Sequence, residues 1–192
     1  MPKAAAKQKI KARIMDAAKI KRILHRMGTE IIERNRDLRK LVIIGLRTRG
    51  IHLARRISRV IKEMEKVDVP VGVMDITPYR DDSPAHKTQP RVLKTGIPFP
   101  VAGRDVVLVD DVLFTGRTIR AAMDGLFDLG RPRSIQLLVF IDRGHRELPI
   151  RADYIGKNLP TSRREVVRVR LKEADGADEI LITEPGRLRG SS

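Results

Sequence analysis

The sequence predicts an α/β domain with a mostly parallel central sheet flanked by helices, and three observations support this fold class. Apolar runs of strand length recur along the 192 residues, at 41–46, 69–76, 106–110 and 134–141. Segments with the three- and four-residue apolar spacing of amphipathic helices lie between them. The runs LVIIGL and VVLV are continuously apolar, as strands buried on both faces of a parallel sheet are. Alternation of such strands with helices is typical of an α/β fold.

The N-terminal part is read as an arm, a helix and one βαβ unit. Residues 1–15 are Lys-rich and weakly patterned, which predicts a mobile basic arm or a frayed first turn. A helix is expected from a cap at Asp16 to about Asn35. The strand 41–46, a loop at 47–50, a helix from Ile51 to about Met64 and the strand 69–76 then form a right-handed βαβ unit.

The rest of the chain contains a long loop, one clear helix and further strands. Residues 77–104 have little periodicity and five Pro, so a lid or binding loop is expected there, with a disordered insertion or a loose hairpin as alternatives. A helix is predicted from Thr118 to Leu129, closed by Gly130. The alternating run 166–171 indicates an edge strand, and 179–183 is the last strand. The domain is therefore placed at 16–184, with 185–192 as a tail.

Composition narrows the possible functions. The absence of Cys excludes disulfide frameworks, thiolate zinc sites and cysteine nucleophiles. Aromatic residues make up only 3%, which argues against binding of single strands on aromatic platforms. No apolar run approaches the roughly 18 residues of a membrane span, and there is no secretory signal, so a cytoplasmic protein is expected. A net charge of +16 concentrates anions such as phosphate esters, nucleic acid or acidic lipids, or it solvates a basic surface.

The segment 106–118 contains the most specific chemistry. Asp110 and Asp111 follow an apolar strand, where two acids are costly unless they bind vicinal ribose hydroxyls or a metal-bound sugar. The next residues supply two hydroxyls, a Gly and a cation, and they open a helix whose N-terminus favours phosphate. Neither GxxxxGK[ST] nor GxGxxG occurs, so a P-loop or Rossmann site is not supported. The alternative is an ordinary capped strand-to-helix turn.

Longer stretches resemble a known family. VVLVDDVLFTGRT resembles the 5-phosphoribosyl-1-pyrophosphate (PRPP) binding motif of type I phosphoribosyltransferases. GLRTRGIHLARRI, MDITPYRDD and DRGHRELPIRADYIGKN are similar to the bacterial pyrimidine operon regulatory proteins (PyrR), which are also uracil phosphoribosyltransferases. The resemblance covers residues 20–183 and implies the type I phosphoribosyltransferase fold with a flexible lid.

The resemblance also implies roles for individual residues. Asp110 and Asp111 are expected to hold the ribose hydroxyls. Mg²⁺ is expected to bind through substrate oxygens and water, with Asp110 or Asp111 as the candidate protein contact and no dedicated ligand set. His145 is a candidate general base, although uracil N1 needs little help. The remaining assignments are the 5-phosphate loop Val112, Leu113, Phe114, Thr115, Gly116, Arg117 and Thr118, the pyrophosphate loop Thr48 and Arg49, the lid residues Tyr79 and Arg80, and Arg143 beside the base.

The expected function is bifunctional. The resemblance implies synthesis of UMP from uracil and PRPP, and binding of pyrimidine-operon leader mRNA under control of UMP or UTP, by a homo-oligomer. The family usually carries other residues at the positions of His25, Thr29 and Pro78. The RNA specificity and lid shape of the family therefore carry over to this chain less directly than its catalysis does. The alternatives are a UMP-sensing regulator with little activity, or a purine or orotate phosphoribosyltransferase. Candidates for RNA contact are Arg26, Arg34, Arg146, Arg151 and Lys157.

Overall fold

A six-stranded sheet forms the centre of the fold in the computed structural model, which describes residues 9–76 and 95–184. Its strand order is β4-β3-β2-β5-β6-β7, and β4 alone runs antiparallel to its neighbour, so the predicted mostly parallel sheet is confirmed. The strands are β2 (Leu41–Leu46), β3 (Val71–Met74), β4 (Thr95–Gly96), β5 (Asp105–Leu113), β6 (Ser134–Asp142) and β7 (Tyr154–Asn158).

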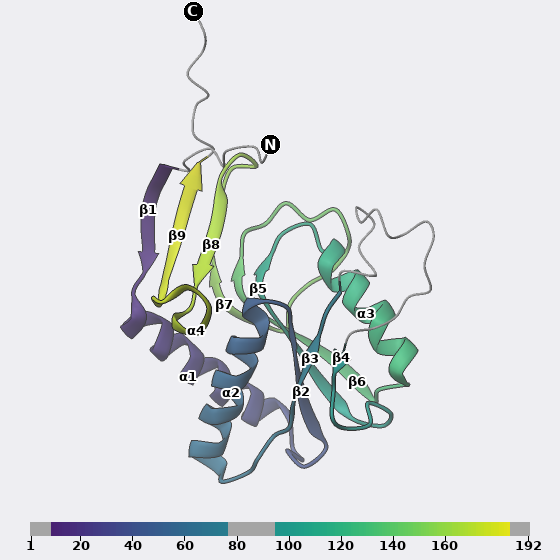
Figure 1. Cartoon of the computed structure of the whole chain (residues 1–192). Helices are drawn as coiled ribbons and strands as arrows, with labels where there is room; N and C mark the ends of the chain where they lie inside the picture. The colour runs from purple at the N-terminus through teal and green to yellow at the C-terminus, as the bar shows by residue number, and fades with distance from the viewer. Residues whose placement is uncertain (1–8, 77–94, 185–192) are drawn as a thin grey trace, which may run out of the picture.

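Helices cover both faces of this sheet (Figure 1). Helices α1 (Ala17–Arg34) and α2 (Arg49–Glu65) pack on one face, and α3 (Arg117–Leu129) packs on the other. Alternate side chains of β5 point to opposite faces. Val107 and Val109 therefore join the core under α1 and α2, whereas Val106 and Leu108 join the core under α3.

The helix ends agree closely with the sequence. The Asp16 side chain accepts a hydrogen bond from the backbone N–H of Lys19 and caps α1, and Asn35 closes its C-terminus. Gly130 closes α3 as predicted. Helix α2 begins at Arg49 rather than Ile51, so the end of the predicted 47–50 loop belongs to the helix. In the part of the chain that the structure describes, no helix is long and apolar enough to cross a membrane.

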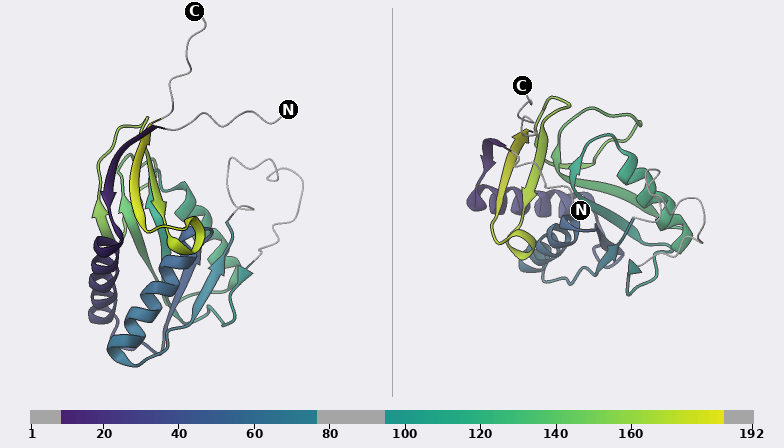
Figure 2. Two further views of the ribbon diagram at one scale, coloured as in Figure 1. Left: turned by 60° about the vertical axis from the view of Figure 1, so that its left-hand side comes forward. Right: turned by 45° about the horizontal axis from the view of Figure 1, so that its top comes forward.

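A second, three-stranded antiparallel sheet stands beside the central one (Figures 1 and 2). Its order is β1 (Lys9–Met15), β9 (Glu179–Glu184) and β8 (Val166–Arg170), and the short helix α4 (Lys172–Asp175) connects β8 to β9. The predicted mobile arm is wrong for residues 9–15, because they pair with β9 and bury Met15. Residues 1–8 lie outside the described residues.

The last part of the predicted lid loop, residues 95–104, belongs to the body of the domain. Residues 77–94 lie outside the described residues, but β4 pairs with β3 and the following chain packs against the central sheet. Ile97 and Phe99 lie against Gly72, and Val101 is buried. The part of the predicted loop from 95 to 104 is therefore attached to the body of the domain, because its apolar side chains complete the core under α3.

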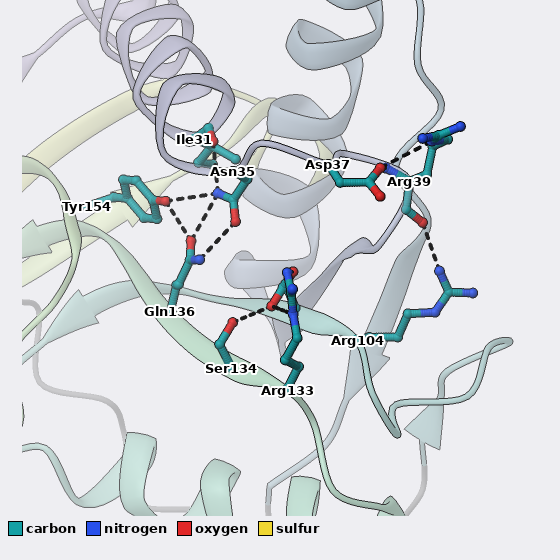
Figure 3. A network of polar contacts seen from close by, with 10 residues as sticks. Ile31, Asn35, Asp37, Arg39, Arg104, Arg133, Ser134, Gln136 and Tyr154 are labelled. Carbon is teal, nitrogen blue, oxygen red and sulfur yellow. Dashed lines mark hydrogen bonds and ion pairs between the residues drawn. The ribbon is translucent and has the colours of Figure 1, made fainter.

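Polar contacts close the amino-terminal edge of the central sheet (Figure 3). Asn35 donates to Gln136 and to the hydroxyl of Tyr154, which in turn donates to Gln136. At the start of β5, Asp105 accepts hydrogen bonds from Arg133 and Ser134. Among the described residues, no fully buried side-chain nitrogen or oxygen lacks a partner. The polar groups at this edge are therefore satisfied by contacts within the protein.

Candidate active site

The carboxyl edge of the central sheet contains a cavity of about 310 Å³. In parallel sheets this edge gathers loops and helix N-termini that bind ligands. Thr48, Asp110, Asp111 and Thr118, predicted from separate parts of the sequence, line the cavity together. The other lining residues are Arg47, Asp75, Ile76 and Val112.

Asp75 was missed by sequence reasoning. Asp75 comes directly after β3, just as Asp110 comes directly after an apolar run in β5. Its Oδ2 atom lies 3.7 Å from Nη1 of Arg47. The rule that found Asp110, an acid at the carboxyl end of a buried strand, would have found Asp75 had it been applied to β3.

The two adjacent acids of β5 occupy an electrostatically costly position. Asp110 is 7% exposed, and its carboxylate accepts a hydrogen bond of 2.9 Å from the backbone N–H of Asp111. Burial, and then the neighbouring Asp111, raise the pKa of Asp110 well above its usual range. Burial also raises the pKa of Asp111, although hydrogen bonding with Asp110 and the charge of Arg49 oppose the shift. A ligand that donates hydrogen bonds or brings positive charge stabilises both ionised forms.

The N-terminus of α2 lies directly against these acids because residue 50 is glycine. A Cβ atom built on Gly50 would meet the carbonyl oxygen of Val109 at 2.4 Å, a distance that real Cβ atoms do not adopt. Thr48 precedes the helix, and the peptide bond between Arg47 and Thr48 is cis. The first N–H groups of a helix have no partner within it, so this end of α2 offers donors to an anion beside Asp110.

The predicted 5-phosphate loop forms the N-terminus of α3. Gly116 caps the helix with a φ of 93°, in the left-handed region that glycine adopts without strain. The carbonyl oxygen of Thr115 accepts backbone hydrogen bonds from Glu147 and Leu148, and Arg117 forms a 2.8 Å ion pair with Glu147. The loop is thus held by the segment after β6, while its helix end stays available to a phosphate.

The structure places Arg143 beneath this loop. The side chain is 6% exposed, and its guanidinium carbon lies 4.1 Å from the centre of the Phe114 ring. It donates hydrogen bonds to Thr161 Oγ1 and to the carbonyl oxygen of Ser162. In this arrangement Arg143 supports the phosphate loop, and its predicted contact with a base stays a prediction.

His145 also packs against Phe114. The two rings meet edge to face with 5.8 Å between their centres. The His145 Nε2 atom lies 2.5 Å from the carbonyl oxygen of Thr161, so this nitrogen donates a proton there. A general base at His145 would have to use Nδ1.

A second cavity, of about 380 Å³, separates Asp111 from the small antiparallel sheet. Arg49 and Asp111 line one side, and β8 with Asp175 lines the other. Sequence reasoning gave β8 no role, because its alternating pattern is that of any half-exposed strand. Arg49 reaches across to Asp175 with two hydrogen bonds, of 3.1 Å from Nε and 2.7 Å from Nη2.

Several of the basic residues proposed for RNA contact lie along α1 and β7. Arg26 donates to the carbonyl oxygens of Ile155 and Gly156, next to Lys157. Arg34 pairs with Asp153 at 2.7 Å and lies over the Tyr154 ring.

Arg146 and Arg151 complete the placement of the predicted residues. The side chain of Arg146 is only 24% exposed and donates to the carbonyl oxygens of Phe114 and Ile150. Arg151 is exposed at the surface before β7. Tyr79 and Arg80 lie outside the described residues.

Comparisons with known proteins identify the family of this chain. The model of the phosphoribosyl transferase domain family matches residues 9–174. A bifunctional protein PyrR of Deinococcus radiodurans is 55% identical over 93% of this chain and 98% of its own. A bifunctional protein PyrR of Pelotomaculum thermopropionicum is 58% identical over 91% of this chain and 96% of its own.

A solved structure shows the same fold at low identity. The hypoxanthine phosphoribosyltransferase of Trypanosoma cruzi superposes with a TM-score of 0.71 at 18% identity, over 92% of this chain and 98% of its own. The type I phosphoribosyltransferase fold expected from the sequence is therefore confirmed. The chain belongs to the phosphoribosyl transferase domain family and, within it, to the bifunctional PyrR proteins.

Proposed function

We propose that the protein transfers the 5-phosphoribosyl group of PRPP to uracil, and that it also binds pyrimidine-operon leader RNA under control of uridine nucleotides. The observation that carries the first activity is the cavity of about 310 Å³ in which Asp110, Asp111, Thr48 and Thr118 meet at two helix N-termini. Membership of the bifunctional PyrR family supports the second activity.

Each part of PRPP has a matching group in this cavity and around it. The carboxylates of Asp110 and Asp111 accept hydrogen bonds from the vicinal ribose hydroxyls. The N-terminus of α3, from Thr115 to Thr118, takes the 5-phosphate, and the start of α2 with Thr48 and Arg49 takes the pyrophosphate. The positive ends of the two helix dipoles and the position of the acids support this division, which the family resemblance implies.

Mg²⁺ is the cofactor that this arrangement suits. Oxygen donors are the ligands this ion prefers, and it keeps several waters alongside substrate phosphates. Asp110 and Asp111 supply carboxylate oxygens at the cavity, and their raised pKa values indicate a site that positive charge would stabilise. When bound, the ion would neutralise charge on the departing pyrophosphate.

The reaction needs positioning and charge stabilisation more than covalent chemistry. Uracil N1 attacks the anomeric carbon and forms the glycosidic C–N bond, while the C–O bond to pyrophosphate breaks and its electron pair leaves with that oxygen. The N1 proton passes to solvent. Positive charge develops on the ribose ring, and the ionised Asp110 and Asp111 beside it lower the barrier.

The base is assigned to the second cavity, between Asp111 and β8. Asp111 lines both cavities. A base held in the second cavity would therefore face a ribose held in the first. Val167 and Val169 of β8 are among its lining residues. Closure of a lid with Tyr79 and Arg80 stays a prediction from the sequence, and so does a homo-oligomeric assembly.

A panel of bases tests the enzymatic proposal. With PRPP and Mg²⁺, uracil is expected to be converted to UMP, and hypoxanthine and orotate are expected to react poorly. Preference for either of those two bases would replace the uracil assignment. Binding of UMP without measurable turnover would instead favour a nucleotide sensor with little activity.

Binding of the gene's own upstream leader tests the RNA proposal. UMP is expected to raise its affinity, and the affinity should fall roughly a thousandfold or more between 50 and 200 mM salt if six to ten phosphates are contacted. A scrambled RNA of equal length is the control. Equal binding of both RNAs, unaffected by UMP, would remove the regulatory role.

A further inference from the structure

One face of α2 is attached to the segment around α4 by two groups of ion pairs. Arg49 and Arg56 lie seven residues apart, about two helical turns, and so project from the same face. Arg49 pairs with Asp175, and Arg56 donates to both Glu173 and Asp178. In the described part of the chain, this α4 segment, residues 171–178, thus contacts the beginning and the middle of α2. Figure 2 shows α4 beside the upper part of α2.

Asp175 is itself held in a fixed position. Its Oδ2 atom accepts a hydrogen bond of 3.0 Å from the backbone N–H of Leu171 as well as the bond from Arg49 Nε. Its own backbone N–H donates to the Leu171 carbonyl oxygen at 2.7 Å, and its carbonyl oxygen accepts from Arg170. Its side chain is only 16% exposed. The carboxylate therefore acts as a rigid partner for Arg49.

The bonding pattern orients the Arg49 guanidinium. Asp175 engages Nε and Nη2, which leaves the Nη1 edge of the planar group for an anion. Arg49 lines the same cavity as Asp111, whose charge it also faces. An arginine on a flexible stem loses rotamer freedom when it binds a ligand, and a fixed partner removes part of that cost in advance.

We infer that Asp175 is a positioning residue for phosphoribosyl transfer, which holds Arg49 in the orientation that receives the pyrophosphate of PRPP. The inference rests on the proposed function, in which Arg49 contacts pyrophosphate. It assigns to α4, which connects two strands of the second sheet, an effect on substrate affinity that acts through Arg49.

Positioning by Asp175 and simple charge repulsion predict opposite changes in pyrophosphate affinity when the Asp175 charge is removed. Asp175 is a negative group close to a site for a highly negative ligand. If its charge dominated, removing the charge would strengthen pyrophosphate binding. If its positioning of Arg49 dominates, removing it weakens that binding.

The test compares Asp175→Asn with Glu173→Gln. Both substitutions neutralise an acid of α4 that pairs with an arginine of α2, but only the first touches Arg49. Pyrophosphate and UMP are titrated separately by calorimetry, and initial rates are measured against PRPP. Asp175→Asn is expected to raise the pyrophosphate Kd and the KM for PRPP by roughly two- to twelvefold, the range for freeing one rotamer-rich side chain. The Kd for UMP, which lacks the pyrophosphate group, should rise by a smaller factor than the Kd for pyrophosphate, and Glu173→Gln should leave all three values near wild type.

Two further variants separate failure of the inference from failure of the proposed function. Arg49→Ala should weaken pyrophosphate binding at least as much as Asp175→Asn, and Asp175→Asn should add little in the Arg49→Ala background. Asp175→Glu, which retains the charge, should recover part of the affinity. If Arg49→Ala leaves pyrophosphate binding unchanged, the proposed role of Arg49 fails.

Three results would overturn the inference while leaving the proposed function in place. They are tighter pyrophosphate binding by Asp175→Asn, an equal loss in Glu173→Gln, and an unchanged Kd in Asp175→Asn where Arg49→Ala weakens binding. Thermal denaturation of each variant checks that the fold persists.

Discussion

The buried acid Asp110 offers a substitution, Asp110→Asn, whose effects on stability and on activity are expected to have opposite signs. Asp110 is 7% exposed beside Asp111, and its carboxylate accepts one backbone hydrogen bond. The side-chain amide has nearly the same shape without the charge. The fold should gain stability because it no longer buries two adjacent acids, and transfer should be lost because the ribose loses an ionised acceptor.

The expected magnitude follows from the burial. Relief of an imperfectly compensated buried charge contributes about 1–2 kcal/mol, in the range measured for buried polar groups. For a domain of this size each kcal/mol raises Tm by roughly 2–4 °C, so an increase of about 2–8 °C is expected. The rate of UMP formation should fall by roughly a hundredfold or more, as when one preorganised electrostatic group is removed.

Asp105 at the other end of β5 provides the matched control. It is equally buried but accepts hydrogen bonds from Arg133 and Ser134, which hold the pKa of its carboxyl below the usual value. Asp105→Asn should therefore destabilise the fold, because the amide cannot accept the same set of hydrogen bonds from Arg133 and Ser134. The Kd for PRPP should change little, since Asp105 lies at the opposite edge of the sheet.

The two variants should also respond to pH in opposite directions. The pKa of Asp110 is raised on folding, so its ionisation costs the native state stability as pH rises from about the ordinary value of 3.8 towards the raised folded value. The advantage of Asp110→Asn should appear above that interval and vanish below it. The pKa of Asp105 is lowered on folding, so its contribution is present above 3.8 and lost as pH falls through its folded value.

Thermal denaturation without ligand, between pH 3 and pH 8, together with UMP synthesis assays, checks these expectations. A lower Tm for Asp110→Asn at pH 7, similar to that of Asp105→Asn, would show that the acid pair does not strain the apo fold. Full activity of Asp110→Asn would show that Asp110 does not hold the ribose.

Three other substitutions test separate parts of the structure. Gly50→Ala should lower Tm and weaken PRPP binding, because the new Cβ meets a carbonyl oxygen at 2.4 Å; unchanged values in calorimetry and thermal melts would count against this close approach. Tyr154→Phe should cost about 0.5–1.5 kcal/mol in denaturant unfolding through loss of its hydroxyl contacts, with normal UMP synthesis. Lys157→Ala should weaken leader RNA binding and reduce the slope of log affinity against log salt by about 1, with no effect on uracil transfer; an unchanged slope would take Lys157 off the RNA surface.

Sequence patterns alone were enough to locate four strands of the central sheet, β2, β3, β5 and β6, and the phosphate-binding core of the site, but they did not predict β4 or β7. Continuous apolar runs identify strands buried on both faces, and the Asp16 and Gly130 signals fix the helix ends because capping depends on neighbouring residues. The chemistry of the segment from Asp110 to Thr118 could also be predicted from neighbouring residues. Its strand, turn and helix N-terminus are contiguous, so their chemistry does not depend on a distant partner.

The distant segments that complete the site became visible only once the fold was known. The basic stretch at 9–15 reads as an arm, but it becomes a strand because β9, some 170 residues later, supplies its hydrogen bonds. Arg143 turns under Phe114, and Arg49 is held by Asp175 on α4. Such contacts depend on how sheets and helices pack after the chain has folded back on itself, and no local periodicity or charge pattern encodes them. The sequence therefore located the cavity's acids and phosphate loop, and the packing of the second sheet decided what faces them.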